Sequence, residues 1–172
     1  MALPTDEILL AAFAKGDREA FDHLASRYAG LLDAYFRRRL ADPGRVEELR
    51  QETLLALYSI LPSYREKGRF RSLVFSIAYR KLASSLRSER SFASLPTELA
   101  AAPRDAEAFE VRAAVDELPE RLREALLLTR FEGLTALEAG EVLSCSADAV
   151  RARVYRAKTL LARKFKDTRR SQ

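Results

Sequence analysis

The chain has 172 residues, of which 48% are hydrophobic and 32% charged, and its formal net charge is +5 at pH 7. This composition excludes an intrinsically disordered chain, and no apolar run approaches the ~20 residues of a membrane span, so we expect no membrane insertion. The basic excess favours a polyanionic partner such as nucleic acid.

The single cysteine and the first residues bear on the compartment. Cys145 is alone, which excludes an internal disulfide and a thiolate-rich metal site and fits a reducing environment. Residues 1–7 lack the basic and apolar regions of a signal peptide, so we expect the mature protein to start near Met1. These two observations predict a cytoplasmic protein.

Helical periodicity begins near the N-terminus. A short helix is predicted over 6–15, where Gly16 ends it, and a longer helix follows an N-cap at Asp17. The inward stripe of the longer helix comprises Phe21, Leu24, Tyr28, Leu31, Leu32 and Tyr35.

Two further helices complete this half of the chain. Residues 42–44 interrupt the pattern before a third helix over about 45–61, and a loop from Pro62 leads to a fourth over 70–90. The residues that the third helix is expected to bury are Val46, Leu49, Thr53, Leu57 and Ile60.

Residues 91–105 contain two prolines, small residues and acidic side chains without helical periodicity, which is typical of a linker. We therefore predict two domains, over 1–90 and 106–172. No run of alternating polar and β-branched residues indicates a strand, so both domains should be small helical units and the fold all-α.

The second domain carries a helix-turn-helix pattern. Thr135 and Glu138 form a capping box at the start of one helix, and Ser146 is placed as the N-cap of the next. Val150, Val154, Ala157 and Leu161 give that second helix an inward face. Its other faces are rich in arginine, which favours a DNA-recognition helix; a solvated basic face is the alternative.

A second basic segment interleaves cations with aromatic rings between Tyr64 and Lys81. Cations that follow phosphates beside rings or a pocket that hold a base suit unstacked nucleic acid. The alternative is that the rings belong to the core of the first domain.

The sequence argues against an enzyme. His23 has no partner at metal-ligand or nucleophile spacing, and no Gly-rich phosphate loop occurs. Glu47 and Glu48 are adjacent on a helix and so diverge rather than converge as an acid–base pair. We expect no catalytic residue, cofactor or metal site.

Several strings in this order resemble the extracytoplasmic-function (ECF) group of bacterial sigma factors, the specificity subunits of RNA polymerase. They are residues 17–21 with Leu24 and Tyr28, 47–53, 70–78, Leu118, Pro119, Arg121, Arg123, Glu124, 126–128, 132–135 and 150–157. The resemblance implies a subunit that binds core RNA polymerase, directs it to promoters and promotes initiation. The alternative is a free-standing helix-turn-helix regulator, which would not need the segment 47–53.

The resemblance also implies three sets of site residues. The polymerase-binding set is Glu47, Glu48, Leu49, Gln51 and Glu52, for which an acidic solvated helix face is the alternative. The set for the promoter −10 element is Lys67, Arg69, Phe70, Arg71, Ser72, Tyr79 and Arg80. The set for the −35 element is Arg151, Ala152, Arg153, Tyr155 and Arg156, four of which the helix pattern also selects.

The remaining implications concern partners and departures. The resemblance implies promoter DNA, core polymerase and an anti-sigma protein as partners, with the chain a monomer in the holoenzyme or in a 1:1 inhibitor complex. Leu73 and Arg80 stand where the family commonly has tryptophan and asparagine, which puts the −10 preference in doubt. Gly140 occupies a small-residue position inside the first motif helix, and Ser144 replaces the usual turn glycine.

Overall fold

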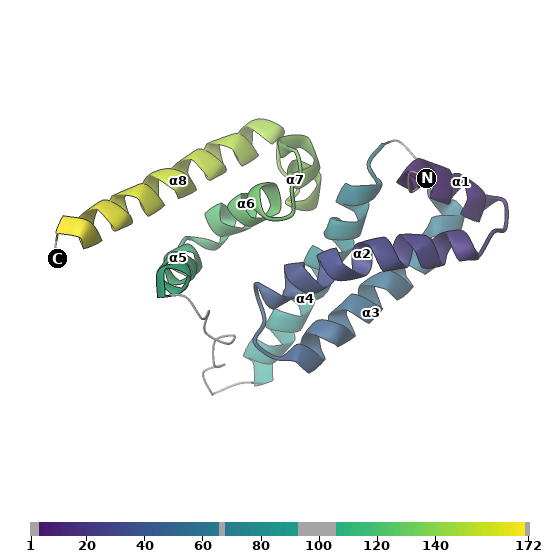
Figure 1. Cartoon of the computed structure of the whole chain (residues 1–172), viewed down its shortest axis with the longest axis horizontal. Coiled ribbons are helices and arrows are strands. Elements are labelled where there is room, and N and C mark those ends of the chain that lie inside the picture. The colour runs from purple at the N-terminus through teal and green to yellow at the C-terminus, as the bar shows by residue number, and fades with distance from the viewer. Residues whose placement is uncertain (1–3, 66–67, 93–105, 171–172) are drawn as a thin grey trace. The chain divides into compact units, whose positions relative to one another are not determined.

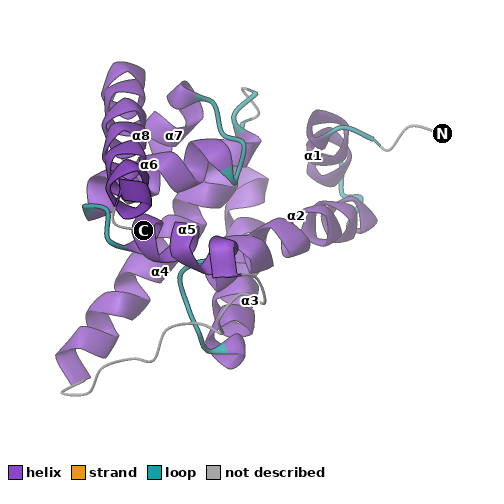
Figure 2. Ribbon diagram, turned by 60° about the vertical axis from the view of Figure 1, so that its left-hand side comes forward, coloured by secondary structure: helices purple, strands orange, loops and turns teal. Residues whose placement is uncertain are grey.

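The computed structural model describes residues 4–65, 68–92 and 106–170, and the linker predicted over 91–105 lies almost wholly outside them. All secondary structure within these ranges is helical, which confirms the all-α prediction (Figures 1 and 2). The chain divides into two compact units, Met1–Ala100 and Ala101–Gln172. Among the described residues, none of the helices combines the length and apolar character needed to cross a membrane.

The first unit consists of α1 (Asp6–Ala14), α2 (Glu19–Arg37), α3 (Pro43–Ile60), the short 3₁₀ helix η1 (Leu61–Ser63) and α4 (Phe70–Phe92). Helix α3 packs against both α2 and α4, and α1 packs against α2. The most deeply buried apolar side chains include Leu24, Leu32, Tyr35, Phe36, Leu49, Val74 and Phe75.

Aspartates start two of these helices. Asp17 Oδ1 accepts from the Glu19 backbone N–H at 3.0 Å, and Asp42 Oδ1 accepts from the Gly44 N–H at 2.9 Å. With Pro43 in its first turn, α3 begins within the Asp-Pro-Gly segment rather than after it. The expectation that Ile60 is buried is wrong, because α3 ends there and Leu61 turns inward instead; the two are 37% and 4% exposed.

The second unit consists of α5 (Ala106–Asp116), α6 (Glu120–Arg130), α7 (Ala136–Val142) and α8 (Ala147–Arg170). Helix α8 packs against α6 and α7. The buried cluster of this unit is Val115, Leu118, Leu126, Leu127 and Ala157, with Leu122, Val154 and Leu161 partly buried against it.

Both predicted helix starts of the helix-turn-helix are confirmed. The Thr135 N–H donates to Glu138 Oε2 at 2.8 Å while the Glu138 N–H donates to Thr135 Oγ1 at 3.2 Å, completing the capping box. Ser146 Oγ accepts from the Ala149 N–H at 3.1 Å at the start of α8. Each of the two helices therefore begins at a side-chain cap, and the turn between them is held to α7 by the Cys145 N–H, which donates to the Gly140 carbonyl at 2.9 Å.

Two residues determine the backbone of the turn between α7 and α8: Gly140, which leaves space for it, and Ser144, which has a positive φ. A Cβ on Gly140 would lie 2.6 Å from the Cys145 carbonyl oxygen, so glycine permits the close approach of the turn to α7. Ser144 has a φ of 51°, the left-handed conformation that glycine adopts without cost.

Opposite stability changes are therefore expected at these two positions. Gly140→Ala should lower the free energy of unfolding by about 2 kcal/mol, because the clash outweighs the better helix propensity of alanine. Ser144→Gly should raise it by about 0.5 kcal/mol, since relief of backbone strain exceeds the added flexibility of the unfolded chain. Urea denaturation of both variants measures the two changes; a stabilised Gly140→Ala protein would show that the turn can move.

Candidate nucleic-acid and partner interfaces

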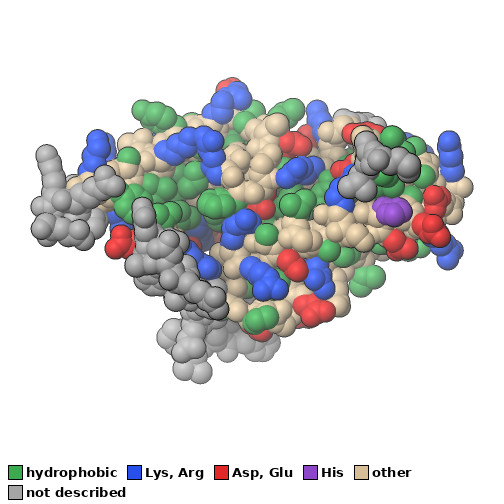
Figure 3. Space-filling model, in the orientation of Figure 1, with side chains coloured by type: hydrophobic (Ala, Val, Ile, Leu, Met, Phe, Trp, Pro, Cys, Tyr) green, Lys and Arg blue, Asp and Glu red, His purple; other side chains and the backbone are tan. Residues whose placement is uncertain are grey.

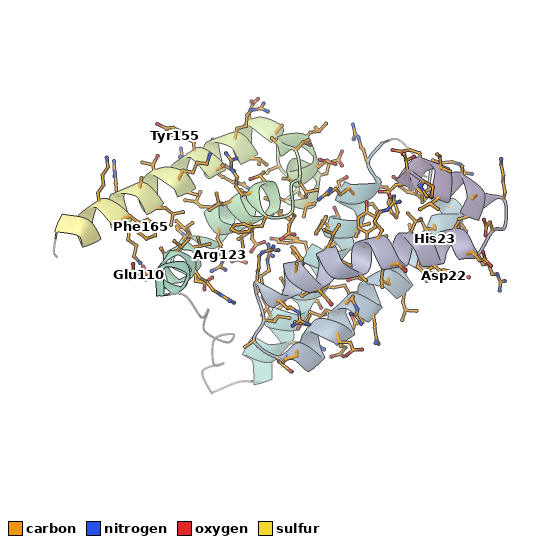
Figure 4. The ribbon with its side chains drawn as sticks, in the orientation of Figure 1. Asp22, His23, Glu110, Arg123, Tyr155 and Phe165 are labelled. Atoms are coloured by element: carbon orange, nitrogen blue, oxygen red, sulfur yellow. The ribbon has the colours of Figure 1, made fainter. Side chains whose placement is uncertain are left out.

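The N-terminal half of α8 presents an exposed basic and aromatic surface. Arg151, Ala152, Tyr155 and Arg156 are exposed, and Tyr155 reaches 73% exposure, projecting from the side of α8 away from α6 (Figure 4). Figure 3 shows cationic side chains along the same helix. The Ser146 cap starts this helix, and its packing against α6 and α7 positions the exposed face on the unit.

The arginines of this helix differ in how far they are engaged. Arg151 Nη2 donates to Asp148 Oδ1 at 2.5 Å on the surface, and Arg153 Nη1 donates to Cys145 Sγ at 3.2 Å, which ties Arg153 to the turn. Arg156 makes no hydrogen bond or ion pair with the described part of the chain. Its guanidinium is therefore available for a bidentate contact with a guanine edge.

The exposed face of α3 carries three of the five predicted polymerase-binding residues. Glu47, Glu48 and Gln51 are exposed, whereas Leu49 is 1% exposed and belongs to the core of the first unit. Glu52 is half-buried and accepts from Lys81 Nζ of α4 at 3.0 Å. Leu49 is thus not part of the candidate surface, because its side chain packs inward. The carboxylate of Glu52 instead links α3 to α4 through its ion pair with Lys81.

Each exposed carboxylate of α3 has a cation beside it on the same helix. Glu48 pairs with Arg45, and Glu47 lies 3.6 Å from Arg50 while accepting from Gln51 Nε2 at 3.1 Å. These pairs are largely solvated and contribute little stability individually. The face is therefore mixed in charge rather than a purely acidic strip.

The prediction of this face missed Leu55, whose side chain is 67% exposed. Glu48, Gln51 and Leu55 follow the spacing i, i+3, i+7, so they lie along one side of α3. An apolar residue at an outward position of an otherwise clear helical pattern was the available signal.

The segment expected to contact the −10 element separates into surface and core. Arg69 and Arg80 are exposed, and Arg71 and Tyr79 are partly buried. Phe70 and Ser72 are only 4% and 2% exposed, so their placement among the DNA-contacting side chains is corrected: they pack in the unit that presents their neighbours. Lys67 lies outside the described residues.

Backbone conformation and hydrogen bonds to backbone carbonyls position the exposed residues of this segment. Gly68 has a φ of 69°, and the Arg69 carbonyl accepts from Ser72 Oγ at 2.9 Å, so the chain enters α4 through a defined turn. Arg80 Nε donates to the Ser76 carbonyl at 3.0 Å, which lays the exposed guanidinium along α4. The alternative that the rings belong to the core holds for Phe70 and for Phe75.

The last candidate groups are the only histidine and the residue types that can ligate a metal ion. His23 is exposed on α2 beside Asp22 (Figures 3 and 4). No group of three or more His, Cys, Asp or Glu side chains within the described ranges could hold a metal ion.

Comparison with known proteins decides the family. The family model for sigma-70 region 2 matches residues 24–92, and that for sigma-70 region 4 matches residues 108–161. The ECF RNA polymerase sigma factor ShbA of Streptomyces griseus is 35% identical over 164 residues, covering 83% of this chain and 86% of that protein. The chain belongs to the ECF group of the sigma-70 family. It is an alternative sigma factor, and sigma factors are transcription initiation factors.

Other relatives extend over nearly the whole sigma factor. The ECF RNA polymerase sigma-E factor of Haemophilus influenzae is 26% identical, and the match covers 94% of this chain and 95% of that protein. The solved structure of CnrH, in complex with the cytosolic domain of CnrY, is 25% identical with a TM-score of 0.72, covering 94% of this chain and 97% of that one. RpoE of Bartonella quintana, solved with the anti-sigma factor NepR, shares the fold at a TM-score of 0.71 and 19% identity, covering 85% and 96% of the two chains.

Proposed function

We propose that the two units of this sigma factor divide promoter recognition between them. The unit over residues 1–90 docks on core RNA polymerase through the exposed face of α3 and holds the melted −10 element at Arg69, Arg71, Tyr79 and Arg80. The unit over 106–172 places α8 in the major groove of the −35 element, with Arg151, Ala152, Tyr155 and Arg156 at the bases. Residues 91–105 join the two.

The observation that carries the proposal is the exposed row Glu48, Gln51 and Leu55 on α3, which no other part of the described unit covers. A free-standing helix-turn-helix regulator needs only the surface of α8. A second surface of carboxylate, amide and apolar side chains supports a protein partner in addition to DNA.

The remaining parts of the proposal follow from this division of labour. The sigma factor catalyses no reaction itself, and the polymerase supplies the chemistry in the cytoplasm, where the DNA is. An anti-sigma protein forming a 1:1 complex is proposed as its inhibitor, since CnrH and RpoE were each solved with a partner of their own.

Run-off transcription on a promoter library tests the proposal. Purified sigma factor and core polymerase together should initiate at a common pair of −10 and −35 sequences, whereas either protein alone should not. DNA binding by the chain without any core-dependent initiation would instead support the free-standing regulator.

A further inference from the structure

A polar contact centred on Asp6 fastens α1 to α2. Asp6 Oδ1 accepts from Arg27 Nη1, and Asp6 Oδ2 accepts from the Tyr28 hydroxyl at 2.5 Å. Arg27 Nη2 also donates to the Pro4 carbonyl, so one arginine joins the start of α1 at two points. Asp6 lies before residue 24, where the match to sigma-70 region 2 begins, so the family comparison says nothing about its role.

The same tyrosine touches the segment assigned to the −10 element. Tyr28 is 4% exposed, and its ring meets that of Phe70 edge to face, with centroids 5.4 Å apart and an interplanar angle of 87°. The ring of Tyr64 also lies beside that of Phe70, with the two centroids 5.9 Å apart. Phe70, the first residue of α4, is therefore in ring contact with Tyr28 of α2 and with Tyr64, which follows η1.

The electrostatics connect Tyr28 to the cationic surface as well. Burial, with the Asp6 hydrogen bond adding to it, raises the pKa of the Tyr28 phenol, whereas the nearby charge of Arg71 acts in the opposite direction. The phenol thus remains a proton donor to Asp6, and Arg71 lies within its electrostatic reach. A carboxylate on α1 and an arginine of the proposed DNA surface act on one buried hydroxyl.

We propose that Asp6 is a positioning residue for −10 recognition. It fixes the hydroxyl of Tyr28, Tyr28 fixes the ring of Phe70, and Phe70 sets the direction of Arg69 and Arg71 on either side of it. The inference rests on the proposed function of the segment 68–72, and it gives α1 a part in promoter recognition.

The test compares open-complex formation by holoenzyme on the promoter recovered from the run-off library and on the same promoter with an altered −10 element. Asp6→Asn and Tyr28→Phe should each lower the ratio of the two rates about tenfold, the effect of one charged hydrogen bond. The double variant should be no worse than Asp6→Asn alone, because the bond between Asp6 and the Tyr28 hydroxyl is shared by both changes and the Asp6–Arg27 pair does not lie on the path to Phe70. Glu7→Gln, on the exposed side of the same turn, should leave the ratio unchanged.

Two readouts separate positioning from stability. Loss of folded protein lowers the rates on both promoters equally and leaves their ratio unchanged, so equal losses for Asp6→Asn overturn the inference. An unchanged ratio with unchanged rates overturns it as well. Variants that lower the ratio of the two open-complex rates should still bind core polymerase with unchanged affinity.

Arg69→Ala, at an exposed position, tests the underlying assignment in the same assay. If Arg69→Ala lowers the ratio and Asp6→Asn does not, the positioning role fails while the −10 surface stands. If Arg69→Ala has no effect, the proposed −10 surface itself is wrong.

Discussion

Replacing both Glu47 and Glu48 with lysine is expected to prevent the sigma factor from assembling with core RNA polymerase. The two side chains are 61% and 54% exposed on α3, where they would face basic residues of the polymerase in the proposed complex. Like charges brought together at an interface cost several kcal/mol, so affinity should fall at least about a hundredfold. Gel filtration of the variant with core enzyme should show two separate peaks.

A matched control makes this result specific. Glu19→Lys combined with Asp22→Lys produces the same change in net charge on the exposed surface of α2 and should leave assembly intact. Glu52 stays unchanged in the test, because a lysine there would face Lys81 and destabilise the α3–α4 contact. Co-elution of the Glu47 and Glu48 double variant with core enzyme would remove this face from the polymerase interface.

The Arg156→Ala variant should lose discrimination at the −35 element by ~1–3 kcal/mol, about five- to 150-fold in relative affinity. Arg156 is exposed and unengaged within the described part of the chain, so no bond is broken inside the unit when it is removed. Arg151→Ala should have a smaller effect, because Arg151 already pairs with Asp148. Equilibrium binding of holoenzyme to matched and scrambled −35 DNA at fixed salt measures both.

Arg163→Ala provides the comparison on the same helix. Arg163 is exposed two turns beyond Arg156, where a recognition helix has left the bases, so its removal should not alter discrimination. If Arg156→Ala weakens binding to matched and scrambled sequences equally, Arg156 contacts phosphate rather than a base.

The helix-turn-helix could be predicted from sequence because its signals are local. The bonds of Thr135 with Glu138, and of Ser146 with Ala149, span only three positions each, so residue type and spacing determine them. The space that Gly140 provides is likewise local, since the oxygen that excludes a Cβ belongs to Cys145 in the next turn.

The first unit shows where sequence patterns fail. Leu49 and Phe70 stand inside strings with site-like composition, but their side chains are buried by contacts with residues distant in sequence, such as Tyr28 against Phe70. Periodicity predicts which face of a helix turns inward; it does not reveal the ion pair between Glu52 and Lys81 or the partner of Asp6. Such contacts depend on how separate helices pack.

The cations beside the α3 carboxylates lower the side-chain conformational entropy that would be lost when a partner binds. Arg45 is held by Ser85 of α4 at 3.0 Å and Arg50 by Asp33 of α2 at 3.1 Å, so the side chains backing Glu48 and Glu47 are anchored to neighbouring helices. Carboxylates restrained in this way lose less rotamer freedom on association, a saving of about 0.5–1.5 kcal/mol for each ordered side chain. Folding of the first unit has thus already ordered a surface that a partner would otherwise have to immobilise.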